Sequence, residues 1–179
     1  MRVEPAAPAD LPAIHAAYAD GRAIQREQGS SVWPEFSDSA ILNEIAAGHL
    51  FCIRDGDELA GVFSVAYEDA AIWGEHERGA HIYLHRIARA AGREGRGLMD
   101  AVLAWARDEC RLRRCAGLRM DTWASNAALI AYYHRLGFNL VGRRRLGSDP
   151  RLPAHYHGTE LALLEQPAQP MQAPDAPRA

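Results

Sequence analysis

A strand-like segment, a glycine-bearing loop and an amphipathic helix follow one another directly between residues 81 and 114. Residues 81–88, HIYLHRIA, alternate in polarity and are rich in β-formers, which predicts a strand. From about residue 96 to residue 114 the apolar side chains share one helical face, namely Leu98, Met99, Val102, Leu103, Ala106 and Cys110. A second strand is predicted at residues 118–122. Such a strand–helix–strand unit places neighbouring strands in a mixed sheet with a right-handed crossover.

The rest of the chain continues this alternation. Further strands are predicted at 1–5, 50–53, 59–67, 138–145 and 156–164, and further helices at 8–28, 37–47 and 126–136. The order β-α-α-β-β-β-α-β-α-β-β predicts an α/β (α+β) fold, with a mixed central sheet of about seven strands flanked by about four helices. We expect residues 1–165 to form one domain and residues 166–179, rich in Pro and Ala, to form a disordered tail.

The composition excludes several classes of protein. All 20 basic residues are arginines, so no lysine can serve a P-loop, a Schiff base or a pyridoxal cofactor. The net charge of −3 argues against a nucleic-acid partner. The three cysteines, in a chain that starts without an apolar leader, indicate a reduced, cytoplasmic protein. No apolar run is long enough for a membrane span, so no membrane partner is expected.

The loop before the long helix carries two glycines between charged residues. Backbone N–H groups at a helix N-terminus bind anions, most often phosphates, and Gly95 and Gly97 let the backbone approach such a ligand closely. Arg93 and Arg96 supply positive charge beside the loop, and Glu94 removes some of it. The loop therefore predicts a phosphate site. The alternative is that its glycines only permit a tight turn into the helix.

Two motifs make the chain similar to the GCN5-related N-acetyltransferase (GNAT) superfamily. The signature strand, loop and helix of that family read here as YLHRIARAAGREGRGLMDAVLAWA, and a later signature reads Asn126-AALIAY-Tyr133-HRL-Gly137-Phe138. The resemblance implies the GNAT fold. It also implies an N-acetyltransferase that moves an acetyl group from acetyl-CoA to an amine of a small molecule or peptide in a direct ternary complex. Homodimers are common in this superfamily, so a homodimer is a further expectation.

The resemblance further implies which residues bind acetyl-CoA. Backbone groups at residues 87–89 would pair with the pantetheine arm, and the N–H groups of residues 95–99 would hold the pyrophosphate. The implied set is Ile87, Ala88, Arg89, Glu94, Gly95, Arg96, Gly97, Leu98, Met99 and Asn126. The family loop is [Gln/Arg]-x-x-Gly-x-[Gly/Ala], of which only Gly97 is kept here. Glu94 and Met99 depart from it and favour the alternative, a degenerate acyl-CoA-binding module without turnover.

Tyr133 is implied by the resemblance as the acid that protonates the departing thiolate. A phenol with an ordinary pKa of ~10 is suited to donate to a thiolate whose parent thiol has a pKa of ~8.5. Its spacing from Leu129 and Leu136 is also that of a core aromatic on a helix, which is the alternative interpretation.

The base that deprotonates the amine is expected on the strand at residues 81–88. Alternation puts His81, Tyr83 and His85 on one face, and Ile82, Leu84 and Arg86 on the other. The strand resembles that of the arylalkylamine N-acetyltransferases, in which a histidine at the position of His85 serves the base. The alternatives are a structural role for His85 or a base at Glu68 or Glu75. Asp121 is a candidate partner for one of the histidines, and no metal is expected.

The acceptor is expected to contact three loops, at residues 29–36, 69–79 and 147–156. Trp33, Phe36 and Trp73 indicate an apolar or aromatic acceptor, whereas the acidic residues of the second loop indicate a cationic one. The alternative for the first loop is that Trp33 only caps the core and does not contact the acceptor. The candidate acceptor residues are Trp33, Phe36, Trp73, Glu75 and Tyr83.

Overall fold

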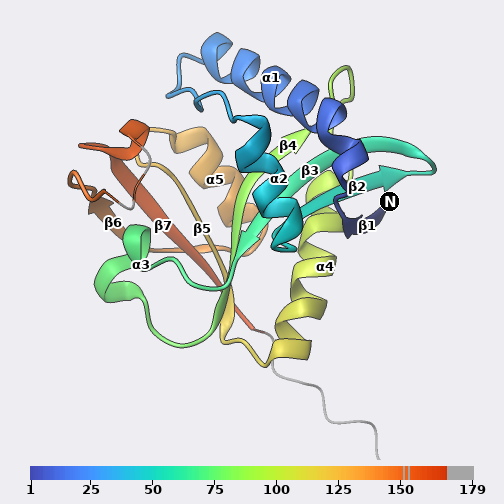
Figure 1. The fold of residues 1–179 in the computed structure, drawn as a ribbon. Coiled ribbons are helices and arrows are strands. Elements are labelled where there is room, and N and C mark those ends of the chain that lie inside the picture. Colours follow the sequence, from blue (N-terminus) through green and yellow to red (C-terminus); the bar gives the residue numbers. More distant parts are fainter. Residues whose placement is uncertain (151, 153, 169–179) are drawn as a thin grey trace, which may run out of the picture.

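The computed structural model describes residues 1–150, 152 and 154–168, whose central element is a seven-stranded sheet in the order β1-β2-β3-β4-β5-β7-β6 (Figure 1). The strands are β1 (Arg2–Pro5), β2 (Leu50–Asp55), β3 (Glu58–Ala66), β4 (His81–Arg89), β5 (Gly117–Trp123), β6 (Asn139–Arg145) and β7 (Glu160–Pro167). The helices are α1 (Leu11–Glu27), α2 (Asp38–Ala46), α3 (Ala70–Trp73), α4 (Leu98–Arg113) and α5 (Ala127–Arg135). The predicted fold class and the order of its main elements are confirmed.

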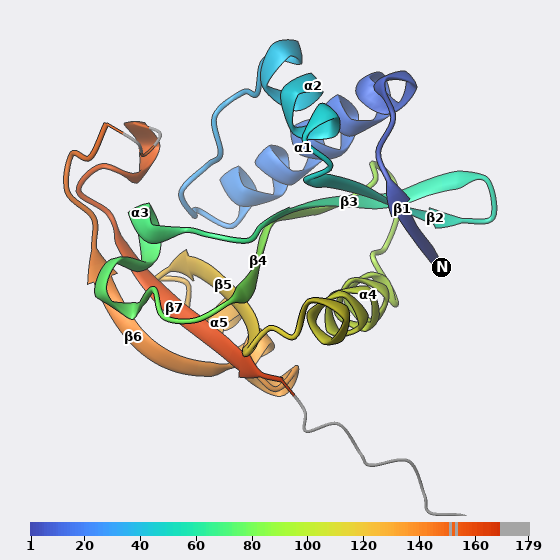
Figure 2. The same ribbon diagram turned by 60° about the horizontal axis from the view of Figure 1, so that its bottom comes forward.

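Helices cover both faces of the sheet. Figure 2 shows α1 and α2 on one side and α4 on the other. The buried face of α4 is the predicted apolar stripe, apart from Met99, which is only partly buried. Local sequence fixes two of the helix starts, because the side chain of Ser37 accepts a hydrogen bond from the Ala40 amide and that of Asn126 accepts one from Leu129.

β4 and β5 are the one parallel pair among the sheet neighbours, and they pair over only three residues each. The register runs from His81 opposite Gly117 to Tyr83 opposite Arg119. Beyond that point β4 continues to pair with β3, while β5 pairs with β7. Figure 1 shows β4 and β5 together at their lower ends and apart above. A sheet that opens in this way leaves one edge of each strand without a strand partner.

A β-bulge interrupts β4 after His85. Ser64 of β3 pairs with His85 and Val62 pairs with Ala88, so two residues of β4 lie opposite one residue of β3. Arg86, in the bulge, has a φ of 47°, in the left-handed region that non-glycine residues rarely adopt. Its guanidinium therefore lies toward α1 and α2, bonded to Ser64 and Glu44, instead of on the face of Leu84. The expectation that Arg86 shares a face with Ile82 and Leu84 is wrong, because simple alternation stops at the bulge.

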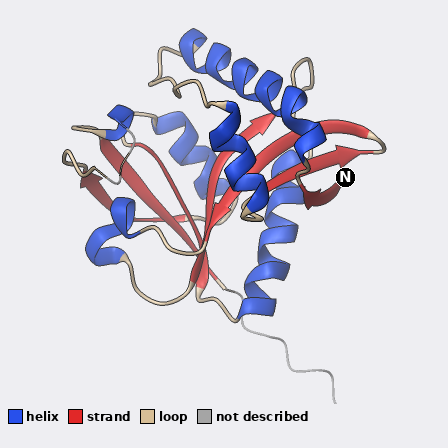
Figure 3. Ribbon diagram, in the orientation of Figure 1, coloured by secondary structure: helices blue, strands red, loops and turns tan. Residues whose placement is uncertain are grey.

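Two further differences from the predicted elements lie at loops (Figure 3). The segment between β3 and β4 was expected to be a loop, yet it contains the four-residue helix α3, which Asp69 caps through a hydrogen bond from the Ile72 amide. Strand β7 begins at Glu160 and extends to Pro167, two residues beyond the predicted end of the domain. Residues 169–179 of the expected tail lie outside the described residues.

Candidate active site

A cleft of about 410 Å³ opens where β4 and β5 separate. Its walls are residues 84–89 of β4, residues 120–123 of β5, the first turn of α4, the inner face of α5, the C-terminal half of α1 with the following loop, and Tyr156. Because backbone groups along the open edges lack a strand partner, an extended ligand can pair with them as an added strand would. The cleft is thus built by the divergence of the strands and by the bulge.

The glycine loop supplies the end of the cleft at α4. Gly95 and Gly97 both have a φ of 72°, which a side chain disfavours, so both glycines are required by the backbone. The Leu98 amide bonds to the Gly95 carbonyl, whereas the amides of Met99 and Asp100 donate to no described residue. Two free N–H groups at the N-terminus of a helix of 16 residues form an anion-binding position.

The charged residues of this loop are already paired. Arg93 forms ion pairs with Asp55 and Glu58 on the β2–β3 hairpin, and Arg96 lies 3.0 Å from Glu94 with both side chains exposed. Arg93 is therefore held away from the role of charge donor that the sequence suggested for it. Gly95, Leu98 and Met99 line the cleft, whereas Glu94, Arg96 and Gly97 do not.

All four of the other predicted cofactor residues, and both proton-transfer candidates, line the cleft. Those that line it are Ile87, Ala88, Arg89, Asn126, His85 and Tyr133, together with Trp33 from the acceptor set. Trp33 also packs edge-on against Tyr18, with ring centroids 6.1 Å apart, so it serves the core and the cleft at once.

The remaining acceptor candidates lie elsewhere, which corrects the prediction. Trp73 and Tyr83 are fully buried and pack against each other, with ring centroids 5.6 Å apart. Phe36 packs on Tyr18 below the guanidinium of Arg86, outside the cleft lining. Glu75 is exposed and is not among the lining residues. Alternation placed these residues on a face or a loop correctly, but it could not show which part of that face other elements cover.

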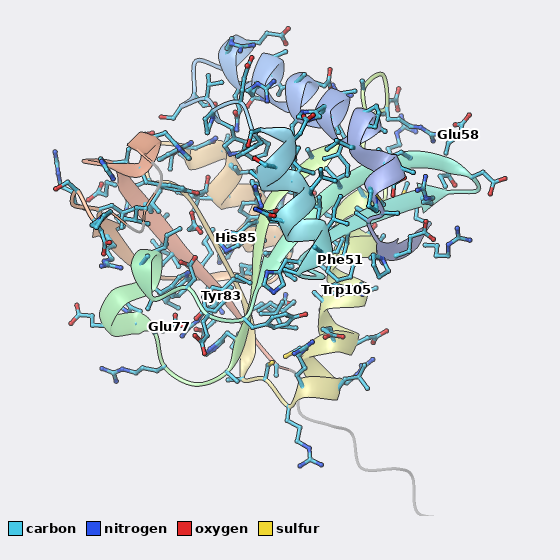
Figure 4. The ribbon with its side chains drawn as sticks, in the orientation of Figure 1. Phe51, Glu58, Glu77, Tyr83, His85 and Trp105 are labelled. Carbon is cyan, nitrogen blue, oxygen red and sulfur yellow. The ribbon has the colours of Figure 1, made fainter. Side chains whose placement is uncertain are left out.

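Tyr83 instead belongs to a closed polar network at the paired end of β4. Its hydroxyl donates to Glu77 and accepts from Arg119 at 2.8 Å, and Arg119 also donates to Glu165 at 2.8 Å. His81 lies 3.6 Å from the same Glu165 carboxylate. Figure 4 shows Tyr83 and His85 in succession along β4, with Glu77 beside Tyr83. The Tyr83 hydroxyl, the Arg119 guanidinium and both carboxylates are joined by hydrogen bonds, which is the pattern of a structural network, although the buried Nε1 of the adjacent Trp73 has no partner among the described residues.

His85 lies in a different environment, between two carboxylates. Its Nε2 is 3.3 Å from Asp69 Oδ2, and its Nδ1 is 3.7 Å from Asp121 Oδ1. Burial acts to lower the pKa of His85, but the contact with Asp69 and the charge of Asp121 outweigh it and raise that pKa above the ordinary value. Burial raises the pKa of Asp121 to about 6, although the charge of His85 opposes this. The predicted pairing of Asp121 with a histidine is confirmed for His85.

Tyr133 and Asn126 reach the cleft from α5. Burial raises the pKa of the Tyr133 phenol above its usual range, and the nearby Tyr132 and Asp121 add to that rise. Within the described part of the chain, the Tyr133 hydroxyl has no hydrogen-bond partner. The Oδ1 of Asn126 caps α5, which leaves its amide NH₂ group to face a ligand. A phenol that stays protonated and unpaired beside the cleft is suited to donate a proton.

Three residues at the cleft or beside it were not proposed as site residues from the sequence. Asp69 and Tyr156 belong to loops that were expected to contact the acceptor but were not named as site residues, and the prediction for Arg86 put it on the wrong face. Tyr156, from the short 3-10 helix Ala154–Tyr156, lines the cleft, and burial first, then Asp121 and Asp69, raise its pKa. The one available signal for Asp69 was its position as an acidic residue shortly after the end of β3.

Three atoms around His85 meet the spacing of a metal site. One ligand atom from each of Asp69, His85 and Asp121 lies within 4.8 Å of the others. However, the two carboxylates approach different ring nitrogens, and a single metal ion can take only one of them. The arrangement fits an imidazole ring with one carboxylate beside each ring nitrogen better than it fits a metal centre. Separately, none of the described helices has the length and hydrophobicity needed to cross a membrane.

Comparison with known proteins defines the family. A family model described as the acetyltransferase (GNAT) family matches residues 18–138. The chain is 30% identical over 125 residues to the "Uncharacterized N-acetyltransferase YesJ" of Bacillus subtilis (strain 168), a match that covers 65% of this chain and 69% of that protein. The chain therefore belongs to the acetyltransferase (GNAT) family. It is an acyltransferase of the N-acetyltransferase type, in a family that uses acetyl-CoA.

Solved structures share the fold. The GNAT-family acetyltransferase from Streptococcus agalactiae 2603 superposes with a TM-score of 0.71 at 21% identity, over 92% of this chain and 94% of that chain. The structure of yncA from Salmonella typhimurium, determined with its cofactor acetyl-CoA, superposes with a TM-score of 0.65 at 19% identity, over 98% of both chains. The comparisons give no support to the alternative of a degenerate module.

Proposed function

We propose that the cleft binds acetyl-CoA along β4 and transfers its acetyl group to the amine of a small molecule or peptide that enters beside His85. The observation that carries this proposal is the combination of an open β4 edge, free amides at the start of α4 and an unpaired phenol in one cleft. The pantetheine arm would pair with residues 87–89, and the pyrophosphate with the amides of Met99 and Asp100. Asn126 would contact the arm from α5.

The residues at the cleft are suited to the proton transfers of the reaction. The acceptor arrives as an ammonium ion, and a basic group of the cluster formed by His85 and Asp121 removes its first proton. The amine nitrogen then bonds to the thioester carbon, and the carbon–sulfur bond breaks. Tyr133 gives its proton to the leaving thiolate and is reprotonated by the second proton of the amine nitrogen. One proton is released to solvent for each acetyl group transferred.

The chemistry of the cleft walls supports an amine with an apolar body. Trp33 and Tyr156 supply aromatic surface, and Trp123 packs on Tyr156 with ring centroids 5.5 Å apart. The carboxylate of Asp121 lies in the cleft lining at the same end and attracts a cation. The cysteines are all free, which supports a reducing compartment such as the cytoplasm.

Calorimetry with acetyl-CoA tests the cofactor part of the proposal. Gly95→Trp places a large side chain in the cleft, so we expect it to abolish the micromolar binding of the wild type. Gly92→Trp is the matched control, because Gly92 has a similar φ of 74° but lies outside the cleft lining with open space around it. Equal binding by both variants would place the pyrophosphate elsewhere. A wild type that fails to bind at millimolar acetyl-CoA would refute the proposed cofactor site, whereas binding without turnover of any amine would favour the degenerate module.

Turnover is tested by release of the CoA thiol in the presence of a panel of amines. Tyr133→Phe retains the ring and its packing on Phe138 but removes the proton donor. We expect it to bind acetyl-CoA normally and to lower kcat by about 10²-fold or more. An unchanged kcat would show that the thiolate leaves without help from Tyr133.

A further inference from the structure

Both ring nitrogens of His85 face a carboxylate oxygen, and this limits what the ring can do. Nε2 lies 3.3 Å from Asp69 Oδ2, and Nδ1 lies 3.7 Å from Asp121 Oδ1. A neutral imidazole has one N–H and one lone pair, so it would set its lone pair against one of the two negative oxygens. The doubly protonated imidazolium instead places a positive charge and an N–H group, with no lone pair, beside both carboxylates. The geometry therefore favours the charged ring in the resting protein.

The two carboxylate oxygens have few other sources of stabilisation. Asp69 Oδ2 and Asp121 Oδ1 are fully enclosed, and neither makes a hydrogen bond of good geometry to a described residue. The Asp121 side chain is only 5% exposed. A buried carboxylate without a partner is costly, and the imidazolium between the two is the neighbouring group that offsets this cost. The cap that Asp69 provides for α3 fixes one side of this arrangement.

We propose that His85 is held as an imidazolium and that Asp121, not His85, takes the proton of the acceptor ammonium, with Asp69 as the residue that positions the ring. The catalytic part rests on the proposed function, whereas the charge state of His85 does not. Asp121 lines the cleft and can meet the acceptor, whereas Asp69 is not among the lining residues. In the transfer the ammonium N–H bond breaks and a carboxylic acid O–H bond forms on Asp121, which later loses this proton to solvent.

Other charged and titratable groups face this cluster from neighbouring elements. Arg86 of β4 adds positive charge that disfavours the imidazolium, although Glu44 already pairs with it. Tyr133 of α5 and Tyr156 approach from the other walls, and both stay neutral because their pKa values are raised. Tyr83 of β4 stacks on the His85 ring, with centroids 6.5 Å apart. The two carboxylates remain the groups that decide the charge of the ring.

The charge state can be measured in the free protein, without any substrate, by ¹⁵N NMR of the imidazole nitrogens. We expect both nitrogens of His85 to be protonated at neutral pH, with a titration midpoint above the ordinary value of ~6.5. Asp69→Asn should lower that midpoint, since asparagine keeps the helix cap but removes the charge. Glu68→Gln, at an exposed neighbour outside the cleft, is the matched control and should leave it unchanged. A neutral His85 ring at pH 7 would overturn the proposal.

The same spectra distinguish a metal site. Zinc ions added at stoichiometric concentration should leave the His85 signals unchanged. A metal-dependent shift of one ring nitrogen that requires Asp69 would instead assign a metal centre and would also overturn the proposal.

The pH dependence of His85→Gln distinguishes the two candidate bases. Without the imidazolium, two carboxylates face each other and the pKa of Asp121 rises further. If Asp121 is the base, the acidic limb of the kcat/KM profile moves to higher pH and activity recovers there. If His85 is the base, activity is lost at every pH. A wild type without turnover would refute the proposed function but leave the NMR result on His85 standing.

Discussion

His81 and His85 lie four residues apart on the same face of the same strand, yet their pKa values are shifted in opposite directions. His81 is 4% exposed, and burial first, then the charge of Arg119, lower its pKa. His85 is 19% exposed, and two carboxylates raise its pKa against the effect of burial. The first histidine belongs to the end of β4 that is paired with β5. The second belongs to the end where the strands have separated.

The difference shows that the neighbouring elements, and not the strand itself, assign the role of a side chain. At the paired end, Arg119 of β5 hydrogen-bonds to Tyr83 and to Glu165 of β7, so the hydroxyl and carboxylate groups of this network have partners. At the open end, Asp69 and Asp121 retain carboxylate oxygens without a hydrogen bond. A satisfied network supports the fold, whereas an incompletely satisfied one beside a cleft is available for a ligand or a proton.

The largest expected effect is a loss of activity when Asp121, at the open end of the strand pair, is replaced. Asp121→Asn keeps the size of the side chain but removes the proton acceptor, so kcat/KM should fall by about 10²–10⁴-fold. The acidic limb of the profile, expected near the Asp121 pKa of about 6, should disappear as well, because activity falls when this carboxylate is protonated. Thiol-release assays across pH measure both. Glu68→Gln should behave as the wild type, and a profile unchanged in Asp121→Asn would contradict the account.

The converse variant lies at the paired end. Arg119→Met fills similar space but leaves the carboxylates of Glu165 and Glu77 without their cation, which should cost about 3–5 kcal/mol of unfolding free energy. Denaturant titration measures this loss. Arg111→Met, at an exposed arginine of α4, should change stability by no more than about 0.5 kcal/mol. The activity per folded molecule of Arg119→Met should stay near the wild-type value. A catalytic loss as large as that of Asp121→Asn would contradict the assignment of the paired end to a structural role.

The smallest expected effect is on the pH dependence of stability, to which the two histidines should contribute with opposite signs. The lowered pKa of His81 means that the unfolded chain binds its proton more readily, so His81 makes the fold less stable as the pH falls below about 6.5. The raised pKa of His85 gives stability that is present below about 6.5 and is lost as the pH rises through the folded-state pKa. Unfolding free energies of His81→Gln and His85→Gln, measured against the wild type from acid to alkaline pH, should reveal opposite slopes. Slopes of the same sign would show that the two sites are alike.

Local patterns predicted most of the fold. The apolar stripe of α4 and the starts of α2 and α5 are short-range features, so the local sequence indicated them. The bulge at Arg86 could not be predicted in the same way, since it depends on the register with β3 and places an arginine at positive φ. Helix α3 has only four residues and carries too little periodicity to be recognised.

The candidate site was predicted where a motif marks it and was missed where it depends on packing. Tyr133, Asn126 and Gly95 reach the cleft as the motifs implied. Trp73 and Tyr83 were assigned to the acceptor because they are aromatic residues near the expected cleft, but α3 packs Trp73 onto Tyr83 and closes that region. Asp69 precedes α3 and His85 lies in β4, so their contact depends on how the chain folds between them and could not be predicted from residue spacing.

Backbone amide chemical shifts, followed while acetyl-CoA is added, test the central claim most directly. We expect shifts at residues 84–89 of β4 and at Met99 and Asp100 of α4, with residues 81–83 and the network around Arg119 nearly unchanged. Binding would then occupy the open end of the strand pair and leave the paired end as support. Shifts concentrated at residues 81–83, or absent from residues 84–89, would contradict the assignment of the cleft.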